Sequence, residues 1–229
     1  MKKIGIIGGM SWESTLTYYK IINKEINKKL GDLNSAEIII FSVNFQEIEQ
    51  YQKLGQWDLA EQVLVKAAKS LEKAGADFIA IATNTMHKLA DPIQRNIHIP
   101  LIHIADAVGE KIVECKINTV GLLGTRFTME EDFYKTKLHK NYNTKVIIPS
   151  LEERKLIHMI IYKELCLGQI KENSKLIFLE IIEKLKQKGA EGIILGCTEI
   201  QMIVPGNISN IKILDSTYIH CEKIIKQII

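Results

Sequence analysis

Two stretches of the chain repeat one another, and this internal repeat constrains the fold more than any other feature. Residues 71–85 read LEKAGADFIAIATNT, residues 185–199 read LKQKGAEGIILGCTE, and the two align without a gap at an offset of 114. Each contains a helix end, a glycine turn, a buried apolar strand and a polar tripeptide. The tripeptides are Thr83-Asn84-Thr85 and Cys197-Thr198-Glu199. We therefore expect two similar halves with one polar cluster at the same place in each.

A second pair of stretches supports a duplication. Residues 3–8 (KIGIIG) resemble residues 119–124 (TVGLLG), and Gly5 is matched to Gly121 at an offset of 116. Because two separate pairs share nearly the same offset, duplication explains them better than chance similarity. The halves are expected at residues 1–104 and 105–214, and a C-terminal helix is expected over 215–229.

Apolar runs and capping signals predict the order of elements. Strands are expected at residues 3–8, 36–43, 77–82, 101–104, 119–124, 145–148, 192–196 and 211–214. Helices are expected after the Ser11–Ser14 segment as far as residue 30, and at 56–73, 105–115, 128–140, 150–167, 174–188 and from 215 onward. Thr128-Met-Glu-Glu131 and Ser150-Leu-Glu-Glu153 match the capping box that opens a helix. Strands that alternate with helices predict an α/β fold: two similar domains related by pseudo-twofold symmetry, each a mostly parallel sheet flanked by helices.

Composition excludes several classes of protein. At 229 residues, 46% hydrophobic and 25% charged, the chain has the size and balance of a soluble globular protein with one or two domains. The net charge of +3 is small and no basic stripe interleaved with aromatics occurs, so no nucleic-acid partner is expected. No apolar run approaches the roughly 18 residues of a membrane span. The four cysteines are far apart in sequence, which fits a reducing compartment, and we expect the protein in the cytoplasm.

Polar loops follow four of the expected strands. They begin at Gly8, Thr83, Gly124 and Cys197. Ligands of parallel sheets bind just beyond the carboxyl ends of the strands. The sequence therefore predicts that the four loops form one active site between the two domains.

The two polar tripeptides suggest a chemistry. At the N-terminus of a short helix, backbone N–H groups and the helix dipole would lower the pKa of Cys197 below about 8.5; the alternative is a buried structural cysteine. Two groups on opposite walls of a site can remove a proton from a carbon and deliver one to its other face, which inverts a stereocentre. Asn84, Thr85 and Thr198, with the loop amides, could hold the carboxylate that stabilises the carbanion.

Four motifs carry a resemblance to a known family. Gly8-Gly-Met-Ser-Trp-Glu-Ser14, Thr83-Asn-Thr-Met-His87, Leu123-Gly-Thr-Arg-Phe-Thr-Met129 and Gly196-Cys-Thr-Glu199 resemble the aspartate/glutamate racemase family, most closely its L-aspartate/glutamate-specific branch. The resemblance implies an isomerase that acts on acidic amino acids by a cofactor-independent two-base mechanism. It also implies two similar α/β domains, often in a homodimer, and a C-terminal helix that returns to the first domain.

The resemblance also implies the site residues. The expected catalytic pair is Thr83 and Cys197. The expected substrate-binding residues are Met10 (through its backbone), Gln52, Asn84, Thr85, Thr198 and Glu199. Arg126 and Lys163 are candidates for the second substrate carboxylate or plain surface residues, and His87 could orient the Thr83 loop or be a structural histidine.

One position departs from the family pattern, which usually has cysteine at both catalytic places. A threonine hydroxyl does not ionise near neutral pH, so Thr83 is expected to donate or relay a proton and not to act as an efficient base. Cys197 is then expected to take the proton of one enantiomer quickly, while the reverse path is slow, and the resemblance implies that this enantiomer is the L form.

Other kinds of site find little support in the sequence. The histidines lack metal-ligand spacing and the Gly5–Gly9 segment is neither a dinucleotide-binding glycine motif nor a P-loop, so no metal or cofactor is expected. Two alternatives to a racemase stay open: a non-catalytic acidic amino-acid binding protein, and a single-cysteine relative such as a decarboxylase or isomerase.

Overall fold

The computed structural model describes residues 1–206, 208 and 211–229; residues 207, 209 and 210, within the expected second half, lie outside it. The chain forms two compact units. Unit 1 comprises Met1–His103 and His220–Ile229, and unit 2 comprises Ile104–Ile219. Each is described by itself below.

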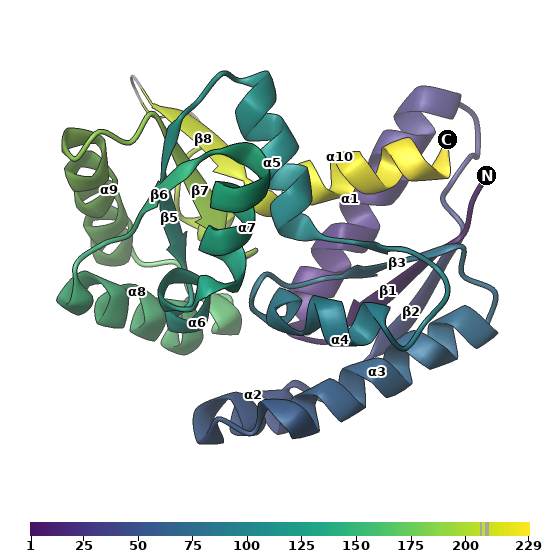
Figure 1. The fold of residues 1–229 in the computed structure, drawn as a ribbon. Coiled ribbons are helices and arrows are strands. Elements are labelled where there is room, and N and C mark those ends of the chain that lie inside the picture. The colour runs from purple at the N-terminus through teal and green to yellow at the C-terminus, as the bar shows by residue number, and fades with distance from the viewer. Residues whose placement is uncertain (207, 209–210) are drawn as a thin grey trace. The chain divides into compact units, whose positions relative to one another are not determined.

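Each unit is a parallel sheet with helices on its faces (Figure 1), which confirms the α/β class. Unit 1 contains β1 (Ile4–Gly8), α1 (Trp12–Leu30), β2 (Ile38–Ser42), α2 (Phe45–Leu54), α3 (Trp57–Lys73), β3 (Phe78–Ile81), the 3₁₀ helix η1 (Thr85–Leu89), α4 (Ala90–Gln94), β4 (Leu101–Ile102) and most of α10 (Ser216–Ile228). Unit 2 contains α5 (Ile104–Glu114), β5 (Thr119–Gly124), α6 (Arg126–Glu130), α7 (Asp132–Tyr142), β6 (Lys145–Ile147), α8 (Leu151–Lys163), η2 (Leu165–Leu167), α9 (Glu172–Gln187), β7 (Gly192–Gly196), η3 (Ile200–Met202) and β8 (Lys212–Asp215).

The two sheets have the same topology. The strand order is β2-β1-β3-β4 in unit 1 and β6-β5-β7-β8 in unit 2, and every pair described is parallel. Gly5 is the register partner of Ile79, and Gly121 is the register partner of Ile193. In each sheet, therefore, the two strands that come from the repeated stretches are neighbours, and they pair in the same register.

The packing around the paired glycines repeats as well. A Cβ atom at Gly5 would lie 3.1 Å from the Cβ of Leu71 on α3, and one at Gly121 would lie 3.4 Å from the Cβ of Leu185 on α9. Leu71 and Leu185 are equivalent residues of the repeat, and each packs its helix closely on the sheet. Glycine at both strand positions lets the helix approach the backbone.

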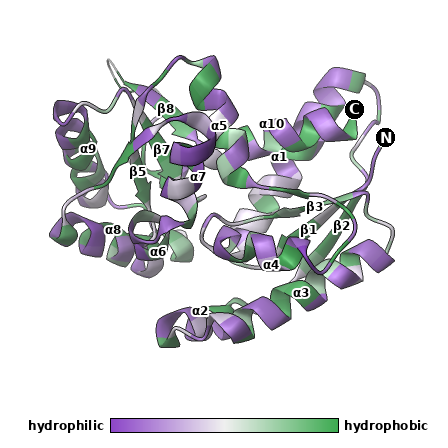
Figure 2. Cartoon of the chain, viewed as in Figure 1, coloured by the Kyte–Doolittle hydropathy of each residue, from purple (hydrophilic) through white to green (hydrophobic). Residues whose placement is uncertain are grey.

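The strands alternate their side chains between two apolar cores in each unit. In unit 1, Ile4 and Ile6 face α1 and the part of α10 from His220 onward, whereas Ile7 faces α3. In unit 2, Leu123 faces α8 and α9, whereas Val120 and Leu122 face α5 and α7. Figure 2 shows mainly hydrophobic strands and helices of mixed character.

The structure corrects the expected helix over residues 128–140. Thr125 is the N-cap, because its side chain accepts from the backbone N–H of Thr128 and α6 begins at Arg126. Glu131 is extended and α7 starts afresh at Asp132. The match of Thr128 and Glu131 to a capping box was therefore misleading, since Thr128 already lies inside a helical turn.

Other boundaries differ less. The capping box at Ser150 is confirmed, but α8 ends at Lys163 and the 3₁₀ helix η2 follows. Three helical segments, α2, η1 and α4, were not predicted. Among the described residues, no helix combines the length and the apolar character that crossing a membrane requires.

Candidate active site

The turn after β1 brings Met10 to the carboxyl edge of the first sheet. Gly9 has a φ of +89°, and a Cβ atom there would collide with the carbonyl oxygen of Val43, so only glycine fits. The N–H of Gly9 donates to the Thr15 hydroxyl at 2.8 Å, which fixes the turn to the first turn of α1. Met10 is buried, which is compatible with the expected role of its backbone in substrate binding.

The loop after β3 holds Thr83, and side-chain donors bind two consecutive carbonyls in it. The Ser14 hydroxyl donates to the carbonyl of Ala82 at 2.6 Å, and the Nδ1 of His87 lies 2.7 Å from the carbonyl of Thr83. Thr83 itself is half-buried, while Asn84 and Thr85 are buried at the start of η1. This role of Ser14 was not predicted from the sequence.

Gln52 lies near the end of α2 and is buried. Its side-chain amide donates to the sulfur of Met86 at 2.9 Å. Met86 belongs to η1 and shares an apolar cluster with Met10. Gln52 is therefore joined to the helical turn that follows Thr83, and Met10 belongs to the same apolar core as that turn.

Cys197 follows β7 directly, as the repeat predicts, and is 9% exposed. Its Sγ donates to Oε2 of Glu199 at 2.9 Å, and the hydroxyl of Thr198 donates to the same oxygen at 2.6 Å. Thr198 and Glu199 are also buried. Unit 2 therefore joins three expected residues in one hydrogen-bonded group, a pairing that their order in the sequence does not reveal.

The expected lowering of the Cys197 pKa is wrong for this environment. Burial raises the pKa of the Cys197 thiol well above its ordinary value of 9.0, and the charge of Glu199 raises it further. The helix that begins three residues after Cys197 is the single turn of η3, so little dipole opposes these effects. At rest, Cys197 is a neutral thiol that donates a hydrogen bond to Oε2 of Glu199.

The two basic candidates for the second carboxylate lie on the surface of unit 2. Arg126 is exposed, its backbone N–H donates to Nδ1 of His158 at 3.2 Å, and its guanidinium carbon lies 5.2 Å from the ring centroid of Phe127. Lys163 is exposed at the end of α8.

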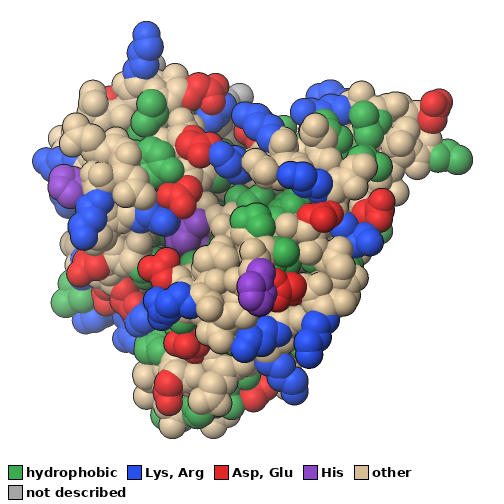
Figure 3. Space-filling view, turned by 45° about the vertical axis from the view of Figure 1, so that its right-hand side comes forward, with side chains coloured by type: hydrophobic (Ala, Val, Ile, Leu, Met, Phe, Trp, Pro, Cys, Tyr) green, Lys and Arg blue, Asp and Glu red, His purple; other side chains and the backbone are tan. Residues whose placement is uncertain are grey.

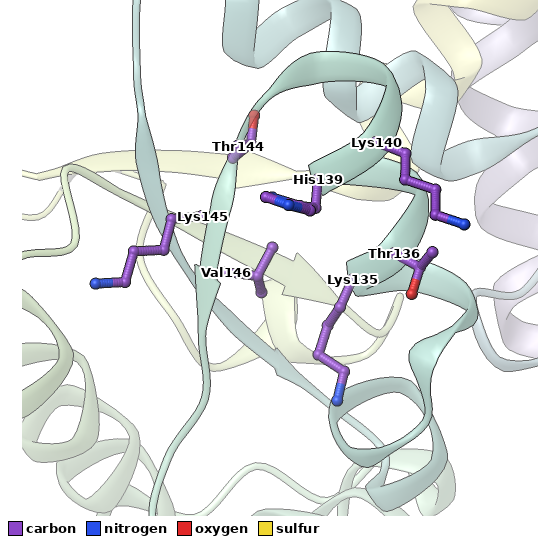
Figure 4. Close-up of a pocket in the computed structure, with 7 residues that line it drawn as sticks. All are labelled: Lys135, Thr136, His139, Lys140, Thr144, Lys145 and Val146. Carbon is purple, nitrogen blue, oxygen red and sulfur yellow. The ribbon is translucent and has the colours of Figure 1, made fainter.

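A hollow of about 520 Å³ lies between α7 and β6. Its lining includes three lysines, but Figure 4 shows their side chains pointing in different directions. Lys135 is also held elsewhere, because its amino group donates to the carbonyl of Glu130 at 2.7 Å. The hollow therefore lacks the converging cations of an anion site.

On the face drawn in Figure 3, basic and acidic side chains are interspersed, and side chains of one charge do not gather in a single patch. Within the described ranges, no group of three His, Cys, Asp or Glu side chains is placed to hold a metal ion.

Comparisons with known proteins agree with this arrangement. The family model for Asp/Glu/hydantoin racemases matches residues 7–224. The broad-specificity amino-acid racemase RacX of Bacillus subtilis is 25% identical over 222 residues, covering 93% of this chain and 92% of RacX.

Solved structures give the same answer. A proposed Asp/Glu racemase from Yersinia pestis is 47% identical with a TM-score of 0.93, and the match covers 99% of both chains. An aspartate racemase homologue from Pyrococcus horikoshii is 40% identical with a TM-score of 0.84, again over 99% of both chains. The chain therefore belongs to the Asp/Glu/hydantoin racemase family and is an enzyme of the racemase class.

Proposed function

We propose that the enzyme racemises acidic amino acids, with L-aspartate and L-glutamate as substrates, without pyridoxal phosphate. The observation that carries the proposal is the Cys197–Glu199 hydrogen bond at the carboxyl end of β7, because it pairs a buried thiol with a proton acceptor. The names of the relatives, which include an amino-acid racemase and an aspartate racemase homologue, support the reaction and the substrate class.

In the proposed reaction, Cys197 is the base for the L-enantiomer. Its thiol proton passes to the carboxylate of Glu199 along the 2.9 Å hydrogen bond. The thiolate then takes the proton from Cα, and the electron pair of the C–H bond remains on carbon as a carbanion. Glu199, expected from the sequence to bind substrate, is assigned here to the thiol.

Thr83 serves the opposite face of Cα in this proposal. Its hydroxyl donates a proton to the carbanion and takes one from a water molecule, and Glu199 returns its proton to the resulting hydroxide through the solvent, which restores the starting charges. Thr83 and Cys197 occupy equivalent strand ends of the two repeats, which is why they are paired here. The reverse reaction starts with an alcohol as base and is therefore slow.

Substrate binding is assigned to the loops around these two groups. The backbone of Met10, the side chains of Gln52, Asn84, Thr85 and Thr198, and the loop amides are proposed to hold the substrate and the charge that develops on its carboxylate.

Isotope exchange tests the proposal. Each enantiomer of aspartate and glutamate is incubated with the enzyme in D₂O, and α-proton exchange and optical rotation are followed. The L-enantiomers should exchange and lose rotation, Cys197→Ala should abolish both, and the control Cys115→Ala, at a half-buried cysteine after α5, should leave both unchanged. Binding without exchange would refute racemisation and favour the binding-protein alternative.

The threonine supplies a second test. Thr83→Cys places an ionisable group at that strand end and should raise the rate on D-aspartate or D-glutamate. If the variant gained nothing on the D-enantiomers, the assigned role of Thr83 would be wrong.

The proposal includes a homodimer in the cytoplasm. Trp12, Leu16 and Tyr19 are exposed apolar residues at helical spacing on α1 and offer a surface for a second copy. The thiol chemistry requires Cys197 to stay reduced, which the cytoplasm favours. Sedimentation equilibrium tests the dimer, and a single species of monomer mass would contradict it.

A further inference from the structure

Three histidine rings and a tyrosine gather behind the Thr83 loop in unit 1. The ring of His87 lies 4.7 Å from that of His103 and 5.5 Å from that of His220, measured between centroids. Tyr18 packs edge-on against His220 at 5.6 Å. His87, His220 and Tyr18 are buried, so the group has little access to water.

The hydrogen-bond partners assign the tautomers of two rings. A carbonyl oxygen can only accept, so the Nε2 of His220, 2.9 Å from the Ile102 carbonyl, carries a hydrogen. Its Nδ1 then accepts from the Tyr18 hydroxyl at 2.8 Å. By the same argument, the Nδ1 of His87 carries the hydrogen that Thr83 accepts. The buried Nε2 of His87 therefore carries a lone pair, and it has no hydrogen-bond partner among the residues that the structure describes.

The group also lies where the chain leaves and re-enters unit 1. His103 is the last residue before the chain enters unit 2, and His220 is the first residue after it returns. The bond from His220 to the carbonyl of Ile102 joins the two crossing segments. The ring of His87 packs against His103 on one segment and His220 on the other, and so connects the Thr83 loop with both segments.

We propose that His87 is the positioning residue of the Thr83 loop: its Nδ1–H holds the Thr83 carbonyl, and the packing against His103 and His220 holds the ring. The proposal rests on the proposed function. Thr83 lies two residues beyond β3, so the sheet ladder does not fix its carbonyl. The bond from His87 and the bond from Ser14 to Ala82 take over that task.

The proposal predicts a change in product partition. With the Thr83 loop displaced, Cys197 still takes the proton of an L-substrate, but the carbanion more often regains a proton from the Cys197 side. Exchange in D₂O continues while racemisation falls. A misplacement of about 1 Å can cost roughly 100-fold in rate, so the ratio of racemisation to exchange should fall about 10- to 100-fold.

Two substitutions distinguish the effect of the hydrogen bond from the effect of the side-chain volume. His87→Leu fills the space but removes the donor, and His87→Asn keeps an N–H near the place of Nδ1. The ratio should fall in His87→Leu and stay within about threefold of wild type in His87→Asn, as expected if the single hydrogen bond holds the loop. His139→Leu, at an exposed histidine on α7, is the matched control and should keep the wild-type ratio.

Two results overturn the proposal: an unchanged ratio in His87→Leu, or exchange and racemisation that fall in parallel in both His87 variants, which marks a merely structural role. A measurement without substrate keeps it testable if the wild-type enzyme shows neither reaction. Long-range ¹H–¹⁵N spectra of the imidazole should show the neutral Nδ1–H tautomer of His87. An Nε2–H tautomer or an imidazolium would overturn the assignment, whereas the absence of wild-type turnover would count only against the proposed function.

Discussion

Acidification should destabilise unit 1 through His220, a buried side chain that is hydrogen-bonded to the Tyr18 hydroxyl and the Ile102 carbonyl. Burial, together with the neighbouring His87, lowers the pKa of His220 from its ordinary 6.5 to about 3. The unfolded chain therefore binds a proton below pH 6.5 that the folded chain does not accept until about pH 3. The stabilisation is complete above pH 6.5 and is lost as the pH falls.

The size of the effect follows from the two pKa values. They differ by 6.5 − 3, or 3.5 pH units, which at about 1.4 kcal/mol per unit gives a loss of about 5 kcal/mol over the whole range. Between pH 7 and pH 4, the part that can be measured conveniently, the loss is about 3 kcal/mol. The pKa of His87 is also lowered by burial, so it acts in the same direction.

Urea unfolding at several pH values measures this loss. Both tryptophans of the chain, Trp12 and Trp57, belong to unit 1, so their fluorescence reports the unit that contains His220. His220→Gln keeps an amide donor and acceptor but does not titrate. Between pH 7 and pH 4, the free energy of unfolding of this variant should therefore fall by about 3 kcal/mol less than that of the wild type. Because the acidic residues are common to both proteins, their contribution cancels in the difference.

The matched control is His139→Gln on α7, where the side chain is exposed. It should show the wild-type dependence on pH. If His220→Gln and the wild type lost the same free energy within about 0.5 kcal/mol, burial of a neutral His220 would not be the cause of acid destabilisation, and the reasoning would be refuted.

Three further predictions concern the site itself. The value of kcat/KM for L-substrates should stay flat between pH 7 and 9, because the thiol passes its proton to Glu199 within the protein and burial keeps the pKa of Cys197 above this range; a rise of about tenfold per pH unit would show that the thiolate forms by losing its proton to solvent. Glu199→Gln removes the acceptor of the thiol proton and should lower kcat by roughly 100-fold or more, measured by exchange from L-aspartate, and a loss confined to KM would instead indicate a substrate contact. Gly9→Ala should lower the thermal midpoint more than Gly75→Ala, because both have positive φ but only a Cβ at Gly9 meets a carbonyl, and equal losses would show that the collision is relieved.

Much of the scaffold could be predicted from the sequence because its signals are local. Strands such as β5 and β7 are uninterrupted apolar runs bounded by glycine or polar residues, and both appear at their expected bounds. The repeat also placed Thr83 and Cys197 after equivalent strands. Periodicity and capping chemistry decide these features, and both are visible residue by residue.

Features that depend on tertiary contacts were missed. Two capping patterns overlap between Thr125 and Glu131, and the position of Thr125 directly after β5 decides between them. The raised pKa of Cys197 depends on burial and on the direction in which Glu199 turns. The burial of Gln52 likewise follows from its contact with Met86, which lies 34 residues away in the chain.

The shared register of Gly5–Ile79 and Gly121–Ile193 has a consequence for how such an enzyme can diverge. In a symmetric dimer of identical half-molecules, every substitution appears in both halves, so the two proton-transfer groups must remain alike. Covalent fusion of the halves removes that requirement, because each copy then has its own codons. One copy could keep a thiol and the other accept a hydroxyl at the corresponding strand end, while the surrounding framework stayed the same.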